Sequence, residues 1–160
     1  DIIRSADKVI FPGVGAADSA MKQLKASGLD KLIPTLTQPV LGICVGMQLM
    51  CKSSKEGNVD CLGIIDVEVE KFESGLKIPH MGWNNIQDIK SSLFNGNHDA
   101  EQMYFVHSYY VPVNEYTIAT TDYGVPFSAA IQKDNFYAVQ FHTEKSGDLG
   151  ESILKNFLEL

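Results

Sequence analysis

The sequence predicts an α/β protein with a doubly wound, mostly parallel sheet and extra antiparallel strands. Three observations support this fold class. Residues 6–52 alternate short apolar strands with helical stretches, residues 64–142 are rich in strand and hairpin patterns, and the last residues have the apolar spacing of a closing helix. A chain of 160 residues with no repeat or linker is expected to form one domain, residues 1–160, around a single core.

The first strand–helix unit begins with "ADKVIFPGVG" at residues 6–15. Residues 8–11 are expected to form a strand that ends in a turn rich in glycine and proline, and residues 18–25 a helix that stops near Gly28. Loops at the carboxyl ends of parallel strands commonly hold functional sites. The "PGVG" turn is therefore expected at the functional edge of the sheet.

The second unit contains the stretch "PVLGICVGMQLM". Residues 39–43 are short, apolar and β-branched, as in a buried parallel strand, and residues 45–52 can continue as a helix. Cys44 then lies at the corner, with Gly42 and Gly46 two positions to either side, as in the G-x-S-x-G nucleophile elbow with Cys in place of Ser. The helix start is expected to lower the pKa of this thiol, which would favour a nucleophile, although a cysteine that simply fills the core has the same apolar surroundings.

The remaining elements are mainly strands. Alternating or β-rich patterns predict strands over residues 64–72, 103–113, 116–124 and 127–142, the last with a hairpin turn at 133–135. The segment "LGESILKNFLEL" predicts an amphipathic helix at the end of the chain.

Charge and cysteine usage narrow the function classes. With 20 acidic against 13 basic residues the net charge is −7, so neither a nucleic acid nor a membrane surface is an expected partner. No apolar run reaches the roughly 20 residues of a membrane span, and the first residues lack a secretory pattern. Three cysteines match neither a disulfide framework nor paired zinc ligands, so we expect a cytoplasmic protein without a metal or cofactor.

A cysteine nucleophile needs a base, and the base needs a partner that orients it. Of the four histidines, only His142 has a carboxylate two residues away, at Glu144. An extended or tightly turned backbone could bring that carboxylate to the imidazole and fix one tautomer, which gives a candidate triad of Cys44, His142 and Glu144. Taken alone, a His-x-Glu pair is more often a solvated surface pair.

The motifs "PGVG", "GICVGMQ" and "QFHTEKS", in that order, resemble those of the class I glutamine amidotransferases. Within that family, "IPHMGWN", "YFVHSYY" and "FHTEKSGDLGESILKNFL" are similar to the glutaminase subunits of imidazole glycerol phosphate synthase in histidine biosynthesis. The resemblance covers nearly the whole chain. It implies a flavodoxin-like three-layer sandwich that lacks its first strand–helix–strand, which would leave an exposed parallel edge.

The resemblance also implies roles for particular residues. Cys44 would attack the side-chain amide of glutamine to form a thioester, His142 would protonate the departing ammonia and then activate water, and Glu144 would orient His142. The oxyanion would be stabilised by backbone N–H groups of Val45 and of Val14 or Gly15. Glycines around Val14 would allow its amide to stay turned away until a partner binds.

Two further sets of residues follow from the resemblance. Residues expected to bind the substrate glutamine are Gln48, Glu56, His107, Ser108 and Tyr109. Residues expected to contact the partner, the cyclase subunit with its (β/α)₈ barrel, are Trp83, Tyr104 and Lys145. Without the resemblance, packing within a strand is the preferred explanation for His107 and Tyr109. Trp83, beside Gly82 on an expected loop, could anchor a partner, although a lone tryptophan is at least as often a core residue.

The sequence departs from the family pattern at Thr143, where the family usually has proline. A less constrained backbone there predicts slower chemistry. Three alternatives remain: a glutaminase of another amidotransferase, a cysteine hydrolase or peptidase of the same architecture, and a non-catalytic interaction module.

Overall fold

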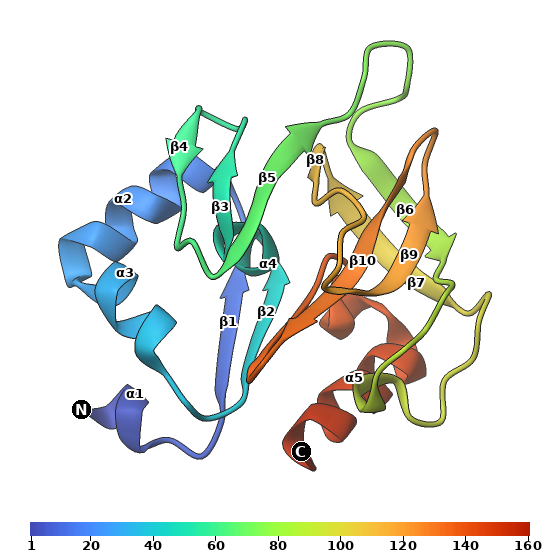
Figure 1. Ribbon diagram of the computed structural model, residues 1–160. Coiled ribbons are helices and arrows are strands. Elements are labelled where there is room, and N and C mark those ends of the chain that lie inside the picture. Colours follow the sequence, from blue (N-terminus) through green and yellow to red (C-terminus); the bar gives the residue numbers. More distant parts are fainter.

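The protein is built around a five-stranded mixed sheet, seen in a computed structural model that describes residues 1–160 (Figure 1). The strand order is β1-β2-β11-β10-β9. Strands β1, β2 and β11 run parallel, and β10 and β9 continue the sheet antiparallel. The bounds are β1 Val9–Gly13, β2 Val40–Cys44, β9 Thr117–Asp122, β10 Pro126–Lys133 and β11 Phe136–Val139.

The other six strands form two smaller sheets beside the main one. One sheet has the order β4-β3-β5-β8, and the other is the antiparallel pair β6-β7. The bounds are β3 Cys51–Ser54, β4 Val59–Asp60, β5 Ile65–Lys71, β6 His80–Asn85, β7 Gln102–His107 and β8 Tyr109–Tyr110.

Helices cover the main sheet from two sides, with α2 and α3 on one side and α5 on the other (Figure 1). Helix α2 buries Ala17, Met21 and Leu24, one stripe at helical spacing, and ends at Gly28 with a φ of 76°. The α-helices are α1 Ile2–Ser5, α2 Ala17–Ser27, α3 Leu29–Leu32, α4 Val45–Leu49 and α5 Gly147–Leu158. Short 3₁₀ turns are η1 Ile33–Thr35, η2 Ser92–Phe94 and η3 Thr143–Lys145.

The helix expected over residues 45–52 is shorter in the structure. Helix α4 ends at Leu49, and Cys51–Ser54 is instead strand β3, paired in parallel with β5. The carbonyl groups of Leu49, Met50 and Cys51 accept hydrogen bonds from amides of residues 62–65. Because these carbonyls bond to a distant segment of the chain, the helix cannot continue through them.

Two other expectations about strands need correction. The strand expected over residues 103–113 is interrupted at Ser108, because β7 pairs with β6 whereas β8 pairs with β5. The segment expected to be a loop around Trp83 is strand β6, in which Trp83 lies directly opposite Tyr104.

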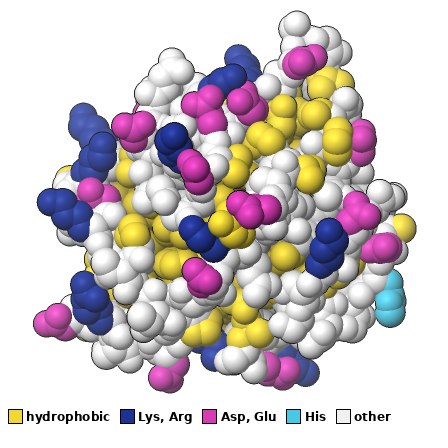
Figure 2. Space-filling model, in the orientation of Figure 1, with side chains coloured by type: hydrophobic (Ala, Val, Ile, Leu, Met, Phe, Trp, Pro, Cys, Tyr) yellow, Lys and Arg dark blue, Asp and Glu magenta, His cyan; other side chains and the backbone are white.

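Charged side chains are dispersed over the surface. On the face shown in Figure 2, lysines and arginines alternate with aspartates and glutamates, and no basic patch forms. None of the helices is both long and apolar enough to cross a bilayer.

Candidate active site

Cys44 occupies a sharp turn between β2 and α4. Its φ of 55° and ψ of −112° are unusual for a residue with a side chain, and such backbone strain is concentrated at functional sites. A Cβ added at Gly46 would lie 1.9 Å from the carbonyl oxygen of Phe11, and one at Gly42 would lie 3.0 Å from the backbone of Gly46. The two glycines therefore let the turn pack against β1, as the sequence pattern predicts.

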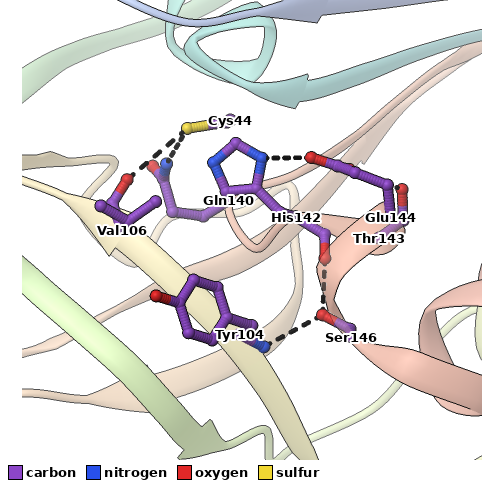
Figure 3. Close-up of polar contacts among 8 residues, drawn as sticks. All are labelled: Cys44, Tyr104, Val106, Gln140, His142, Thr143, Glu144 and Ser146. Carbon is purple, nitrogen blue, oxygen red and sulfur yellow. Dashed lines mark hydrogen bonds and ion pairs between the residues drawn. The ribbon is translucent and has the colours of Figure 1, made fainter.

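His142 lies between Cys44 and Glu144 (Figure 3). Its Nδ1 is 2.6 Å from Oε1 of Glu144, a carboxylate whose side chain is 54% exposed while the imidazole is buried. A carboxylate only accepts at neutral pH, so Nδ1 carries the proton and Nε2, which faces the sulfur, has a free lone pair. This tautomer can accept a proton from the thiol.

Backbone contacts hold the segment that carries His142. Its amide donates to the carbonyl of Tyr104 over 2.9 Å, and its carbonyl accepts from Oγ of Ser146 over 2.6 Å. The same Oγ accepts from the amide of Tyr104 (Figure 3). Thr143 is buried and begins η3, so Glu144 reaches the imidazole without a proline at residue 143.

A pocket of about 270 Å³ opens at Cys44. It brings together residues from six separate segments of the chain, including every candidate for the oxyanion hole and for glutamine binding. Its lining residues are Val14, Gly15, Cys44, Val45, Gln48, Glu56, Pro79, Val106, His107, Ser108, Tyr109 and His142. Of the candidate catalytic residues, only Glu144 lies outside the lining, behind His142 (Figure 3).

Three residues at the site were not anticipated from the sequence: Pro79 and Val106 in the lining, and Gln140. The side-chain amide of Gln140 donates to the sulfur of Cys44 over 3.8 Å and accepts from Nε2 of Gln48 over 2.9 Å. Gln140 directly follows β11 and precedes His142 by two residues, a spacing that puts side chains on one face of an extended segment. That spacing was the available signal for Gln140.

Burial raises the pKa of the Cys44 thiol to about 11. The amide of Val45 at the start of α4 and the side chain of Gln140 act in the opposite direction, but they do not outweigh the loss of solvation. The expectation of a lowered pKa is therefore wrong for the free protein. The thiol is protonated near neutral pH, and a base has to remove its proton as it reacts.

Glu56 has a structural contact as well as a place in the pocket. Its Oε1 accepts the amide of Ala17 over 2.7 Å, at the first residue of α2. The loop that carries Val14 and Gly15 leads directly into that helix. Glu56 therefore links the candidate oxyanion loop to the wall of the pocket.

Trp83, Tyr104 and Lys145 lie together, although the chain carries them on three segments. The rings of Trp83 and Tyr104 meet edge to face with centroids 5.8 Å apart, and Nζ of Lys145 lies 6.0 Å from the Tyr104 ring. Trp83 is 53% exposed. The three side chains form one accessible surface.

The family model for class-I glutamine amidotransferases matches residues 3–160. The chain therefore belongs to the class-I glutamine amidotransferase family, as its elbow and motif order predict. Within this family it resembles "Imidazole glycerol phosphate synthase subunit HisH" of Bacteroides fragilis strain YCH46, with 63% identity over 163 residues covering 100% of this chain and 83% of the relative. The same subunit of Escherichia coli strain K12 is 55% identical over the same shares. These identities place the chain in the HisH group and confirm the resemblance predicted from the sequence.

Solved structures agree on the fold. A glutamine amidotransferase matches with a TM-score of 0.73 at 16% identity, over 98% of this chain and 80% of that chain. Another, from Thermotoga maritima, matches with a TM-score of 0.66 at 17% identity, over 96% and 63%. The predicted fold class is confirmed.

Proposed function

We propose that this chain hydrolyses glutamine to glutamate and ammonia at Cys44 and supplies the ammonia to the cyclase subunit of imidazole glycerol phosphate synthase, in the histidine biosynthesis of the cytoplasm. One observation carries the proposal. A strained elbow cysteine and a histidine oriented by a carboxylate at 2.6 Å open on one pocket of about 270 Å³. Membership of the HisH group supports the partner.

The geometry supports a two-stage mechanism. Nε2 of His142 takes the thiol proton as the sulfur attacks the amide carbon, and the negative charge that develops on the amide oxygen faces the amide of Val45 and the loop at Val14 and Gly15. His142 then passes the proton to the leaving nitrogen, the C–N bond breaks, and ammonia departs. Nε2 of His142 then deprotonates a water molecule, which attacks the thioester carbon. The C–S bond breaks, glutamate is released, and the sulfur takes back the proton as a thiol.

Recognition of glutamine is assigned to the other residues that line the pocket. Glu56 offers a carboxylate to the α-ammonium group, since only one of its oxygens is used by Ala17. Gln48 and the segment His107–Tyr109 offer amide and backbone groups to the α-carboxylate and the side chain. For the cyclase, we assign the surface of Trp83, Tyr104 and Lys145, because an exposed aromatic pair under a cation suits a protein partner.

The test is release of ammonia from glutamine, measured with and without the cyclase subunit and its nucleotide ligand. We expect activity that rises with the cyclase and is abolished by Cys44→Ala. Activation by a different synthase would point to another amidotransferase, and turnover of peptides without any partner would point to a hydrolase. A folded chain that is inactive with every partner would leave a binding module.

A further inference from the structure

Behind the pocket wall at His107 lies a second histidine, His80, which the proposed mechanism does not use. Its Nδ1 is 2.9 Å from Nε2 of His107 across the β6-β7 pair. Its Nε2 is 3.2 Å from the side-chain nitrogen of Asn84, four residues further along β6. Both imidazoles are buried, with 4% of His80 and 6% of His107 exposed.

The surroundings of the two rings allow one arrangement of protons. The Asn84 nitrogen is a donor only, so Nε2 of His80 accepts and Nδ1 of His80 carries the proton. That proton is donated to Nε2 of His107, which leaves Nδ1 of His107 to donate to the carbonyl of Tyr109 over 2.8 Å. Every ring nitrogen of the two histidines then has one partner, and each hydrogen bond in the series is donated in the direction from Asn84 to Tyr109.

This relay of hydrogen bonds ends in the pocket. The carbonyl of Tyr109 also accepts from Nε2 of Gln48 over 2.9 Å, and the same Nε2 donates to Oε1 of Gln140 over 2.9 Å. His107, Tyr109 and Gln48 all line the pocket. The orientation of the Tyr109 carbonyl and the Gln48 side chain in the pocket wall therefore depends on the proton at Nδ1 of His80.

Aromatic packing fixes the plane of His80. Its ring stacks on Tyr123, with centroids 4.1 Å apart, and on Phe105, with centroids 5.0 Å apart. Burial lowers the pKa of His80 to about 4 and that of His107 to about 3, so both rings stay neutral near pH 7. A second proton on His80 would point its Nε2–H at the NH₂ group of Asn84, and a second proton on His107 would point its Nε2–H at Nδ1–H of His80.

Building on the glutaminase function proposed above, we propose that His80 is a positioning residue for glutamine binding, which sets the tautomer of His107 and through it the Tyr109 carbonyl and Gln48. It touches neither Cys44 nor the substrate. Substrate and transition state meet the same wall, so loss of the relay raises KM and leaves kcat nearly unchanged.

The first variant is Asn84→Asp, which replaces one NH₂ group by an oxygen at a half-buried position. It removes the hydrogen bond to His80 together with the one that the same nitrogen donates to the carbonyl of Asp122 over 3.0 Å. A carboxylate cannot donate to Nε2 of His80, so the proton of His80 moves from Nδ1 to Nε2. The proton of His107 then moves from Nδ1 to Nε2 as well, and the carbonyl of Tyr109 faces a nitrogen lone pair in place of a donor. We expect KM for glutamine to rise about fivefold, the effect of roughly one hydrogen bond, with kcat within about twofold of wild type in the complex with the cyclase. The matched control is Asn95→Asp, the same change at an exposed side chain next to η2 that has no hydrogen bond; it keeps the wild-type KM.

A second pair of variants separates hydrogen bonding from packing. His80→Phe keeps an aromatic ring between Tyr123 and Phe105, and His80→Asn keeps a donor near the place of Nδ1. The relay requires the KM of the Asn variant to be closer to wild type than that of the Phe variant, whereas a packing role requires the opposite. Nitrogen NMR of the wild type should show Nδ1–H tautomers for both His80 and His107.

A wild-type KM in Asn84→Asp, an equal rise in Asn95→Asp, or Nε2–H tautomers in the wild type would each overturn the role of His80. Absence of glutamine hydrolysis by the wild-type complex would instead overturn the proposed function, so the two failures are distinct.

Discussion

The turn at Cys44 leaves no room for a side chain at Gly46, not even a methyl group. Its Cβ would lie 1.9 Å from the carbonyl oxygen of Phe11, whereas a Cβ at Gly42 would meet backbone and the flexible end of Met50 at 3.0 Å. We expect Gly46→Ala to reduce the free energy of unfolding by about 3 kcal/mol, and Gly42→Ala by about 1 kcal/mol. Urea unfolding measures both, and equal losses would contradict the close contact with β1.

The thiols of Cys44 and Cys51 should react at different rates. Burial raises the pKa of both, but Cys44 lines the pocket whereas Cys51 is fully covered. We expect iodoacetamide to modify Cys44 faster, with a rate that rises about tenfold per pH unit between pH 7 and 9 as the thiolate fraction grows. Peptide mass spectrometry follows each site, and equal rates would favour the non-catalytic alternative.

Gln140 acts directly on the nucleophile. Its amide donates to the Cys44 sulfur and favours the thiolate, so its removal raises the pKa of the thiol further. We expect Gln140→Leu to lower kcat about tenfold and to slow alkylation of Cys44 at pH 8, because hydrogen bonds to charged groups are among the stronger ones. Gln102→Leu, at an exposed position on β7, is the control. An unchanged alkylation rate would show that the contact does not reach the thiolate.

At the scale of elements, the start of α2 depends on Glu56. The N-cap residue Ala16 makes no capping hydrogen bond with its side chain, and Oε1 of Glu56 supplies the acceptor for the amide of Ala17. We expect Glu56→Ala to reduce the free energy of unfolding by about 1 kcal/mol and Glu56→Gln to retain it, since an amide oxygen also accepts. In glutamine hydrolysis both variants should raise KM, because both lose the charge. If the Gln variant were as unstable as the Ala variant, the hydrogen bond to the amide of Ala17 would not account for the stabilising effect of Glu56.

Strand β6 presents Trp83 to solvent, opposite Tyr104. We expect Trp83→Ala to leave the unfolding midpoint unchanged and to weaken binding of the cyclase about thirtyfold, as for an interface anchor. Calorimetric titration measures the affinity. Leu158→Ala, at an exposed apolar residue on α5, is the control, and a similar loss there would remove the assignment of this surface.

Elements with strong local patterns were predictable, and elements defined by distant pairing were not. The Cys44 corner and helix α2 follow from glycine placement and helical spacing within one segment. The end of α4 at Leu49 depends on amides of residues 62–65, and the strand at Trp83 depends on its pairing with β7, so neither has a local signal.

The same distinction holds for the site. The residues of the candidate triad stand in recognisable motifs, whereas His80 gains its place from a cross-strand contact with His107, 27 residues away. A single sequence does not reveal such a register. The roles assigned to these residues stay predictions until the variants are measured.

At the scale of the whole molecule, the buried histidines make stability depend on pH. Burial lowers the pKa of His80 and His107 to about 4 and about 3, while the unfolded chain takes up protons near the ordinary value of about 6.5. The unfolded state therefore binds more protons below that pH, and stability falls as the pH decreases from about 6.5 toward 4. The rings face Asn84, the Tyr109 carbonyl and Tyr123, with His142 near His107, and none of these offers a negative charge to an imidazolium.

We expect each of the two histidines to lower the free energy of unfolding by up to about 1.4 kcal/mol for every pH unit of acidification in that window. Urea unfolding at pH 7.5, 6 and 5 measures the slope. His80→Phe should reduce it, whereas replacement of the exposed His98 by Gln should not. A slope that is the same in all three proteins would mean that His80 is not excluded from protonation in the folded state.

Strand β11 lies in the middle of the main sheet, between β2 and β10, yet it follows all the other strands of that sheet in chain order. When synthesis has reached residue 135, strand β2 still has one edge unpaired, and Cys44 has no base. The next residues supply both the missing strand and His142, within about a second of translation. Nascent chains therefore remain vulnerable to aggregation, and chemically silent, until closure of the sheet and assembly of the catalytic pair occur together.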